Sequence, residues 1–172
     1  MSAGGWRVRR AGEGDVERLA LVGAATFLET FADILDGSAV LAHCSRAHAI
    51  SVYRGYLTQG AAAWLGETEG GAPVGYVLLT QPELDGALPG DLELKRIYLL
   101  SRFHGTGLGK VLMDAAIAEA RARGAARLLL GVYRQNSRAI AFYRRSGFVD
   151  VGTRQFQVGE QLYDDVVLGR TL

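Results

Sequence analysis

The stretch that decides the fold is His104-Gly105-Thr106-Gly107-Leu108-Gly109-Lys110. It follows an extended apolar run, Leu92 to Leu100, and leads into an amphipathic segment of helical period that ends near Arg123. Three glycines at alternate positions let the backbone turn tightly, and the helix start that follows offers unpaired N–H groups and the positive end of the helix dipole. The stretch therefore predicts a strand-to-helix turn that either holds an anion such as a pyrophosphate or simply connects the two elements.

A second segment downstream strengthens the first interpretation. The run from Asn136 to Tyr143, followed by Ser146-Gly147-Phe148, has the pattern N-x-x-A-x-x-F-Y-x-x-x-G-F. Asn136 and Tyr143 are close to two helical turns apart, so both project from one helix face. Together with H-G-T-G-L-G, this segment resembles the two signature segments of the GNAT superfamily of acetyltransferases. The specific motifs lie between Glu93 and Phe148, and element order extends the resemblance to most of the chain.

Composition narrows the class of protein. The chain has 172 residues, enough for one domain with one core. Nineteen Lys and Arg against 18 Asp and Glu give a formal net charge of +1, which gives no reason to expect nucleic acid as a partner. No apolar stretch reaches the ~18 residues of a membrane span, and Met1 to Arg7 lacks the apolar core of a signal peptide. We expect one N-acetyltransferase domain over residues 1–172, cytoplasmic, with no membrane partner.

Hydrophobic periodicity predicts strands and helices in alternation. Their order is similar to that of the GNAT fold, and the resemblance implies an α/β chain with a mixed, largely antiparallel twisted sheet of about seven strands and about four helices. The expected strands are Trp6–Arg10, Ala62–Glu67, Val74–Thr80, Leu92–Leu100, Arg127–Val132, Val149–Val158 and Leu162–Leu168. The expected helices are Glu13–Phe31, Ser38–Leu57, Gly107–Arg123 and one that opens at Asn136. The predicted core stripe of the third helix is Leu108, Val111, Leu112, Ala115, Ala118, Glu119 and Ala122, apolar except for the glutamate.

The resemblance implies that acetyl-CoA is the cosubstrate and that no metal is used. The backbone amides of Gly105, Thr106, Gly107, Leu108, Gly109 and Lys110 would hold its pyrophosphate. The Lys110 side chain either adds charge there or is a solvated helix lysine. The family usually has Arg or Gln where this chain has His104, which we interpret as a surface residue beside the phosphates and not as a base.

The resemblance also implies how the pantetheine arm is bound. The strand before the turn splays from its neighbour in this family, so Ile97, Tyr98 and Leu99 would present free backbone groups to the arm. An amide near Ile97 would face the thioester carbonyl, while the side chains of Ile97 and Leu99 belong to the core. Asn136 would contact the pantetheine region, cap its own helix, or do both.

Two residues are assigned to proton transfer by the resemblance. The Tyr143 hydroxyl would protonate the leaving thiolate; the alternative is a core tyrosine beside Phe142 and Phe148. Glu93 precedes Ile97 on the same strand and would be the base, directly or through water. The alternative for Glu93 is a solvent-facing charge or an ion pair with a neighbouring cation, Lys95 or Arg96.

The acceptor site is the least specified part. Phe27–Phe31, Leu94–Leu99 and Tyr163–Leu168 look like the branch of the family that includes polyamine acetyltransferases. Acidic side chains at Glu29, Asp33 and Asp36 either attract an ammonium group or are solvated helix charges. The residues assigned to substrate binding are Phe27, Glu29, Thr30 and Phe31.

We therefore predict an N-acetyltransferase that transfers an acetyl group from acetyl-CoA to a primary amine, a small molecule such as a polyamine, by direct attack in a ternary complex. Cys44, the single cysteine, lies far from the motifs, which disfavours a covalent intermediate and excludes a zinc site of several thiolates. Two alternatives stay open: a protein or peptide N-terminal acetyltransferase, and a non-catalytic acyl-CoA-binding module. Homodimer formation also stays open.

Overall fold

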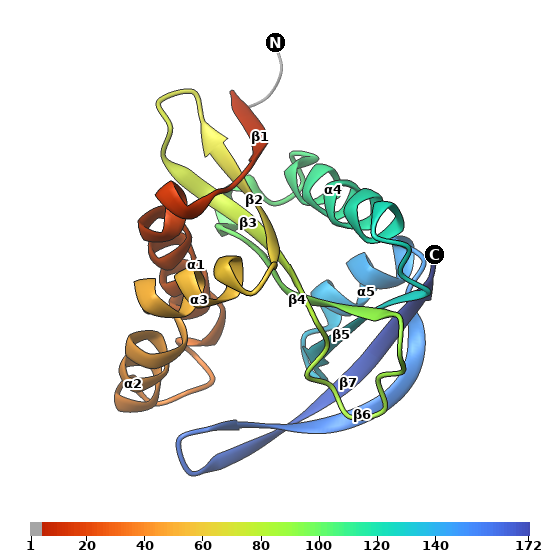
Figure 1. Cartoon of the computed structure of the whole chain (residues 1–172). Helices are drawn as coiled ribbons and strands as arrows, with labels where there is room; N and C mark the ends of the chain where they lie inside the picture. Colours follow the sequence, from red (N-terminus) through yellow and green to blue (C-terminus); the bar gives the residue numbers. More distant parts are fainter. Residues whose placement is uncertain (1–4) are drawn as a thin grey trace.

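The structure is a computed structural model that describes residues 5–172. One twisted sheet runs through the molecule (Figure 1). Within these residues seven strands lie in the order β1-β2-β3-β4-β5-β7-β6. Neighbouring strands are antiparallel except β4 and β5, which are parallel. The predicted fold class is confirmed. The strands are β1 (Trp6–Arg10), β2 (Ala62–Thr68), β3 (Pro73–Thr80), β4 (Asp91–Leu99), β5 (Arg127–Tyr133), β6 (Val149–Val158) and β7 (Gln161–Thr171).

Helices cover both faces of the sheet (Figure 1). One face carries α1 (Val16–Phe31) and α3 (Ile50–Thr58), with α2 (Gly37–Ala47) beyond them, and the other carries α4 (Leu108–Ala122) and α5 (Ser137–Arg145). Short 3-10 turns precede α1 (η1, Glu13–Asp15) and α4 (η2, Ser101–Phe103). No helix of residues 5–172 is long and apolar enough to cross a membrane. The expectation about a signal peptide concerns Met1 to Arg7, and the first four of these residues lie outside the described part.

The buried face of α4 differs from the predicted stripe. Leu108 and Leu112 are buried as expected, but Val111 is 41% exposed. The other buried positions of the helix are Met113, Ala116, Ile117 and Ala120. Alanines at 5 of its positions make several faces of α4 almost equally apolar, so periodicity alone did not select the face that meets the sheet.

The predicted helix from Ser38 to Leu57 is divided in two. Ala47 ends α2, and Ala49 is extended (ψ 148°) and caps α3. At the break, the Arg96 Nη2 of β4 donates to the Ala47 carbonyl at 3.1 Å, which satisfies one of the free carbonyls of the helix end. The break is therefore fixed by a contact with a distant strand, and the local sequence contains no glycine or proline that would indicate it.

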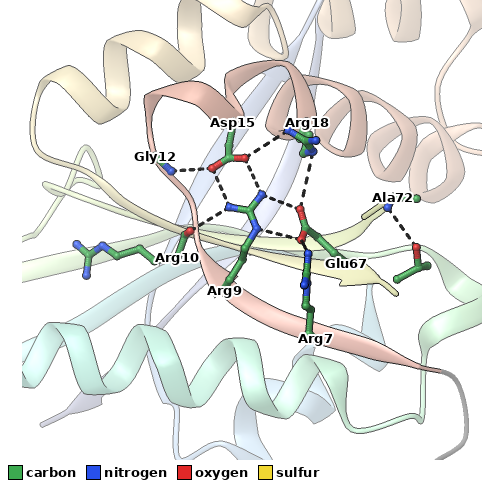
Figure 2. A network of polar contacts seen from close by, with 9 residues as sticks. Arg7, Arg9, Arg10, Gly12, Asp15, Arg18, Glu67 and Ala72 are labelled. Atoms are coloured by element: carbon green, nitrogen blue, oxygen red, sulfur yellow. Dashed lines mark hydrogen bonds and ion pairs between the residues drawn. The ribbon is translucent and has the colours of Figure 1, made fainter. Parts of the chain in front are cut away.

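A network of ion pairs joins β1 and β2 to the start of α1 (Figure 2). The Arg9 guanidinium donates to both oxygens of Asp15, at 2.9 and 2.7 Å, and to both oxygens of Glu67, at 2.9 and 2.7 Å. The Glu67 side chain is 1% exposed, and Arg7 and Arg18 approach it from either side. Because both carboxylates share one planar donor, the network fixes the outer strand against the first helix.

Candidate active site

The sheet opens where β4 leaves β5. The two strands pair only at their first residues, from Asp91 opposite Arg127 to Glu93 opposite Leu129, whereas β4 pairs with β3 as far as Leu99. A register shift makes Lys95 an extra residue in β4, a bulge that bends the strand. From Leu94 onward the edge of β4 that faces β5 is unpaired. The splay that the resemblance implies is present.

The glycine-rich turn lies at the end of the splayed strand. Gly105 (φ +75°) and Gly107 (φ +90°) adopt the left-handed backbone that favours glycine, and Gly107 is the N-cap of α4. Helix geometry leaves the first N–H groups of α4, those of Leu108, Gly109 and Lys110, without intrahelical acceptors, and only that of Leu108 donates to the turn, at 3.5 Å to the Thr106 hydroxyl. A Cβ built on Gly105 would meet nothing within 4 Å. The turn therefore offers free amides and open space to an anion.

His104 and Lys110 flank these amides. The His104 Nε2 lies 3.1 Å from the Leu99 carbonyl, which can only accept, so Nε2 carries the proton. Burial lowers the pKa of the ring, which is half-buried. The Lys110 side chain is 77% exposed and pairs with Asp114 one helical turn on. His104 therefore ties the turn to the end of β4.

Helix α5 brings Asn136 and Tyr143 to the same site. The Asn136 side chain accepts from the Ala139 amide at 3.2 Å, so the expected N-cap is confirmed. The Tyr143 ring packs 6.1 Å from that of Phe148, and burial raises the pKa of the Tyr143 hydroxyl well above its usual range. The hydroxyl is thus protonated at neutral pH and able to donate. Both residues line the cavity described next.

A cavity of about 690 Å³ runs through the splay and joins the two faces of the sheet. Of the predicted site residues, Thr106 and Leu108 do not line it: the Thr106 hydroxyl donates to the Phe103 carbonyl at 2.8 Å, and the Leu108 side chain is fully buried in the core. The predicted residues that do line it are Phe27, Glu29, Thr30, Phe31, Glu93, Ile97, Tyr98, Leu99, His104, Gly105, Gly107, Gly109, Lys110, Asn136 and Tyr143.

Glu93 lies in the cavity wall with its carboxylate already engaged. One oxygen accepts from the Glu83 amide at 2.7 Å, and the other lies 3.6 Å from the Lys95 ammonium. The expected ion pair with Lys95 is therefore present, and the side chain is 2% exposed. Its role as the base stays a prediction.

The acceptor end of the cavity is defined here as the wall formed by Gly23, Phe27, Phe31, His43, His48, Arg96, Arg154 and Phe156. It lies between the α1–α2 side and the β6–β7 hairpin. Phe27 stacks on His43 with ring centroids 4.1 Å apart. Burial, with the positive charge of Arg96, lowers the pKa of His43 to about 4 and that of His48 to about 3. Both rings are therefore neutral at physiological pH.

The acidic residues expected near an ammonium group are used elsewhere. Both oxygens of Glu29 accept from Ser101, one from its amide and one from its hydroxyl, each at 2.7 Å. The Asp36 side chain caps α2 by accepting from the Ala39 amide at 3.0 Å. Asp33 and Asp36 do not line the cavity. Glu29 and Asp36 therefore stabilise a turn and a helix start.

The sequence analysis did not assign the two arginines of the acceptor end to the site. Arg154 pairs with Asp165 at 3.1 Å across β6 and β7, and Gly131 of β5 leaves the room for it, since a Cβ there would lie 2.6 Å from the guanidinium. Arg96 was noted only as a partner for Glu93. Its alternation with Tyr98 on β4 was the signal that both side chains face the α1–α3 side.

Comparison with known proteins agrees with this geometry. Residues 28–148 match the model of the acetyltransferase (GNAT) family. An uncharacterized N-acetyltransferase of Mycobacterium tuberculosis (strain ATCC 25618 / H37Rv) is 34% identical over 158 residues, which cover 92% of this chain and 98% of that protein.

Solved structures show the same fold. PaiA N-acetyltransferase from Thermoplasma acidophilum, in complex with coenzyme A, has a TM-score of 0.80 at 19% identity over 97% of this chain and 99% of that one. Ribosomal-protein-alanine N-acetyltransferase from Brucella melitensis has a TM-score of 0.73 at 24% identity over 96% of this chain and 99% of that one. With the family match and the mycobacterial relative, the chain belongs to the GNAT family and is an N-acetyltransferase of that family.

Proposed function

We propose that this enzyme transfers an acetyl group from acetyl-CoA to the primary amine of a small molecule, by direct attack while both substrates are bound. The observation that carries the proposal is the single cavity that joins the glycine-rich turn on one face of the sheet to the acceptor end on the other. Two substrates that enter from opposite faces would meet at the splay, beside Ile97.

The chain offers a complete binding surface for the acyl donor. The first amides of α4 are free for the pyrophosphate, and Arg138 and Arg145 of α5 add positive charge to the same wall. The unpaired edge of β4 presents backbone N–H and C=O groups to the pantetheine arm, which carries amides of its own. Asn136 and Ala139 of α5 line the opposite side.

The proposal assigns a group to each step of acyl transfer. The neutral amine attacks the thioester carbonyl carbon, and an amide near Ile97 stabilises the charge that develops on the carbonyl oxygen. The C–N bond forms, the C–S bond breaks, and Tyr143 gives its proton to the departing thiolate. Glu93 takes the ammonium proton, directly or through water. Cys44 does not line the cavity, and burial raises the pKa of its thiol, so a covalent route is disfavoured.

Three classes of acceptor or role are compatible with the proposal's chemistry and its alternatives. The resemblance predicts a polyamine; a protein or peptide N-terminus and a non-catalytic acyl-CoA-binding role are the alternatives. The aromatic walls of the acceptor end, among them Phe27, Phe31 and Phe156, suit a small molecule with an apolar body.

The test is a product screen. The purified chain is incubated with acetyl-CoA and, separately, with spermidine, monoamines, amino acids and peptides with a free N-terminus; CoA release and the mass of the product are followed. We expect acetylation of at least one small amine. Acetylation of peptides alone would establish the protein N-terminal alternative. Binding of acetyl-CoA without any acetylated product would establish the non-catalytic one.

A further inference from the structure

We infer that the acceptor carries a carboxylate as well as its primary amine, and that Arg96 binds this carboxylate at the acceptor end. The inference deepens the proposed function and depends on it. It starts from a charge in the cavity wall that the protein leaves without a counterion.

The other cations around this wall have carboxylate partners. Arg154 pairs with Asp165 at 3.1 Å, and Lys95 lies 2.6 Å from Glu83. For Arg96, by contrast, no carboxylate of residues 5–172 lies within 4.0 Å, although Arg96 lines the cavity and is mostly buried. A buried cation without a counterion is costly, so the pattern favours a partner that arrives with the substrate.

The contacts of Arg96 hold it in place without neutralising it. Its guanidinium carbon lies 5.3 Å from the centre of the Tyr53 ring and 5.7 Å from that of Tyr56. Nη2 donates to the Ala47 carbonyl, while the buried Nη1 has no hydrogen-bond partner within residues 5–172. Two aromatic rings and one carbonyl therefore orient the planar group, and part of its donor capacity remains unused.

No neighbouring group supplies the missing negative charge by titration. His43 and His48 are neutral at physiological pH because burial and Arg96 lower their pKa. Burial raises the pKa of Tyr53, so its hydroxyl is also neutral. The carboxylates that line the cavity are engaged with other groups: Glu29 with Ser101, Glu93 with the Glu83 amide and Lys95, and Asp165 with Arg154. A counter-charge for Arg96 would therefore arrive with a bound molecule.

The chemistry and position of Arg96 indicate a short aminocarboxylate. A planar guanidinium matches a planar carboxylate, and one guanidinium balances one negative charge. Arg96 and Ile97, where we place the thioester carbonyl, line the same cavity, so one bound molecule can contact both. A polyamine would instead bring a second ammonium toward Arg96, which is unfavourable. We therefore favour amino acids over polyamines.

The experiment compares matched acceptors that differ only in the carboxylate: phenylalanine against phenethylamine, and γ-aminobutyrate against propylamine, with spermidine as the polyamine. We expect the wild type to prefer the carboxylate member of at least one pair by about 10- to 100-fold in kcat/KM, the range of a charge-assisted hydrogen bond. Arg96→Met, which keeps length but removes charge, should abolish this preference while acetyl-CoA affinity, measured by calorimetry, stays within about threefold.

Two further variants sharpen the test. Arg96→Lys keeps the positive charge but loses the planar guanidinium and its paired N–H donors, so it should retain part of the preference. Arg54→Met removes an exposed cation from α3 that does not line the cavity, and should leave the preference unchanged. If the wild type acetylates amines but shows no preference for those with a carboxylate, the inference is overturned and the proposed function is not. This result does not depend on whether any Arg96 variant folds. An unchanged preference in folded Arg96→Met would also overturn the inference. If no amine is acetylated at all, both the proposed function and the inference are overturned.

Discussion

At the scale of single residues, Tyr143 occupies two environments at once. Its ring packs in the core against Phe148, and the residue also lines the cavity. Tyr143→Phe removes only the hydroxyl, so kcat should fall by about 10²- to 10⁴-fold with little change in acetyl-CoA affinity. Steady-state kinetics and calorimetry measure the two effects. Tyr163→Phe, whose hydroxyl bonds Gln161 outside the cavity, is the matched control. A loss explained wholly by weaker acetyl-CoA binding would make Tyr143 a packing residue.

Glu93 is the residue whose role the pH profile tests. A carboxylate has to be ionised to take a proton from the ammonium, so a carboxylate base predicts a rate that falls on the acidic side of the profile. Glu93→Gln keeps the acceptor for the Glu83 amide but cannot take a proton, so kcat should fall and this low-pH limb should vanish. The measurement is kcat/KM against pH for both proteins. An unaltered profile would assign the base to water or to another group.

At the scale of elements, the Arg9 network ties β1 to the start of α1 and makes stability depend on pH (Figure 2). The hydrogen bonds that Arg9 donates to Asp15 hold the pKa of the Asp15 carboxyl at about 2, below its value in the unfolded chain. Asp15 therefore contributes stability, about 2 kcal/mol, that is present above pH ~4 and lost as pH falls toward 2.

Urea unfolding measures this contribution. Asp15→Asn should lower the free energy of unfolding at pH 7 by about 2 kcal/mol, and its difference from the wild type should narrow as the pH is lowered to 3. Asp150→Asn, in an ion pair whose side chains are more than half exposed, should change little at either pH. A difference that is absent, or that does not vary with pH, would show that Asp15 is not held in its charged form by Arg9.

Substitutions in the glycine-rich turn can separate an effect on acetyl-CoA binding from an effect of backbone strain on stability. Gly107→Glu should abolish acetyl-CoA binding, because it adds a negative charge beside the amides that would hold the pyrophosphate. Gly60→Glu introduces the same side chain at nearly the same backbone angle, φ +89° against +90°, but on an exposed turn outside the cavity. It should lose stability to a similar extent and keep its affinity. Calorimetry that finds unchanged affinity in folded Gly107→Glu would remove the turn from the site.

Element by element, the sequence predicted what local periodicity determines. The strand boundaries were predicted to within a few residues because each strand is marked by an alternating or continuous run of apolar residues. The break after Ala47 was not predicted, since it depends on Arg96 from a strand far along the chain. The unpaired edge of β4 was expected only from the family resemblance. Arg96 itself was overlooked because a charged strand residue usually has a carboxylate partner, and its lack of one is visible only in three dimensions.

At the scale of the whole molecule, the sheet divides where β4 leaves β5 (Figure 1). The cavity at this splay is lined by residues from the elements on both faces of the sheet. The α4–α5 side carries the free helix-start amides, and the α1–α2 side with the β6–β7 hairpin forms the acceptor end. Placing the two substrates on opposite faces allows them to be bound together, which favours direct transfer without storage of the acetyl group on the protein.

Simultaneous binding of both substrates is measured by initial-rate kinetics in which the two substrate concentrations are varied. The measurement uses acetyl-CoA and whichever amine the screen identifies, followed by mass spectrometry of enzyme mixed with acetyl-CoA alone. We predict intersecting double-reciprocal lines and unmodified enzyme. Parallel lines, together with an acetyl group retained on the protein at Cys44 or elsewhere, would contradict the account.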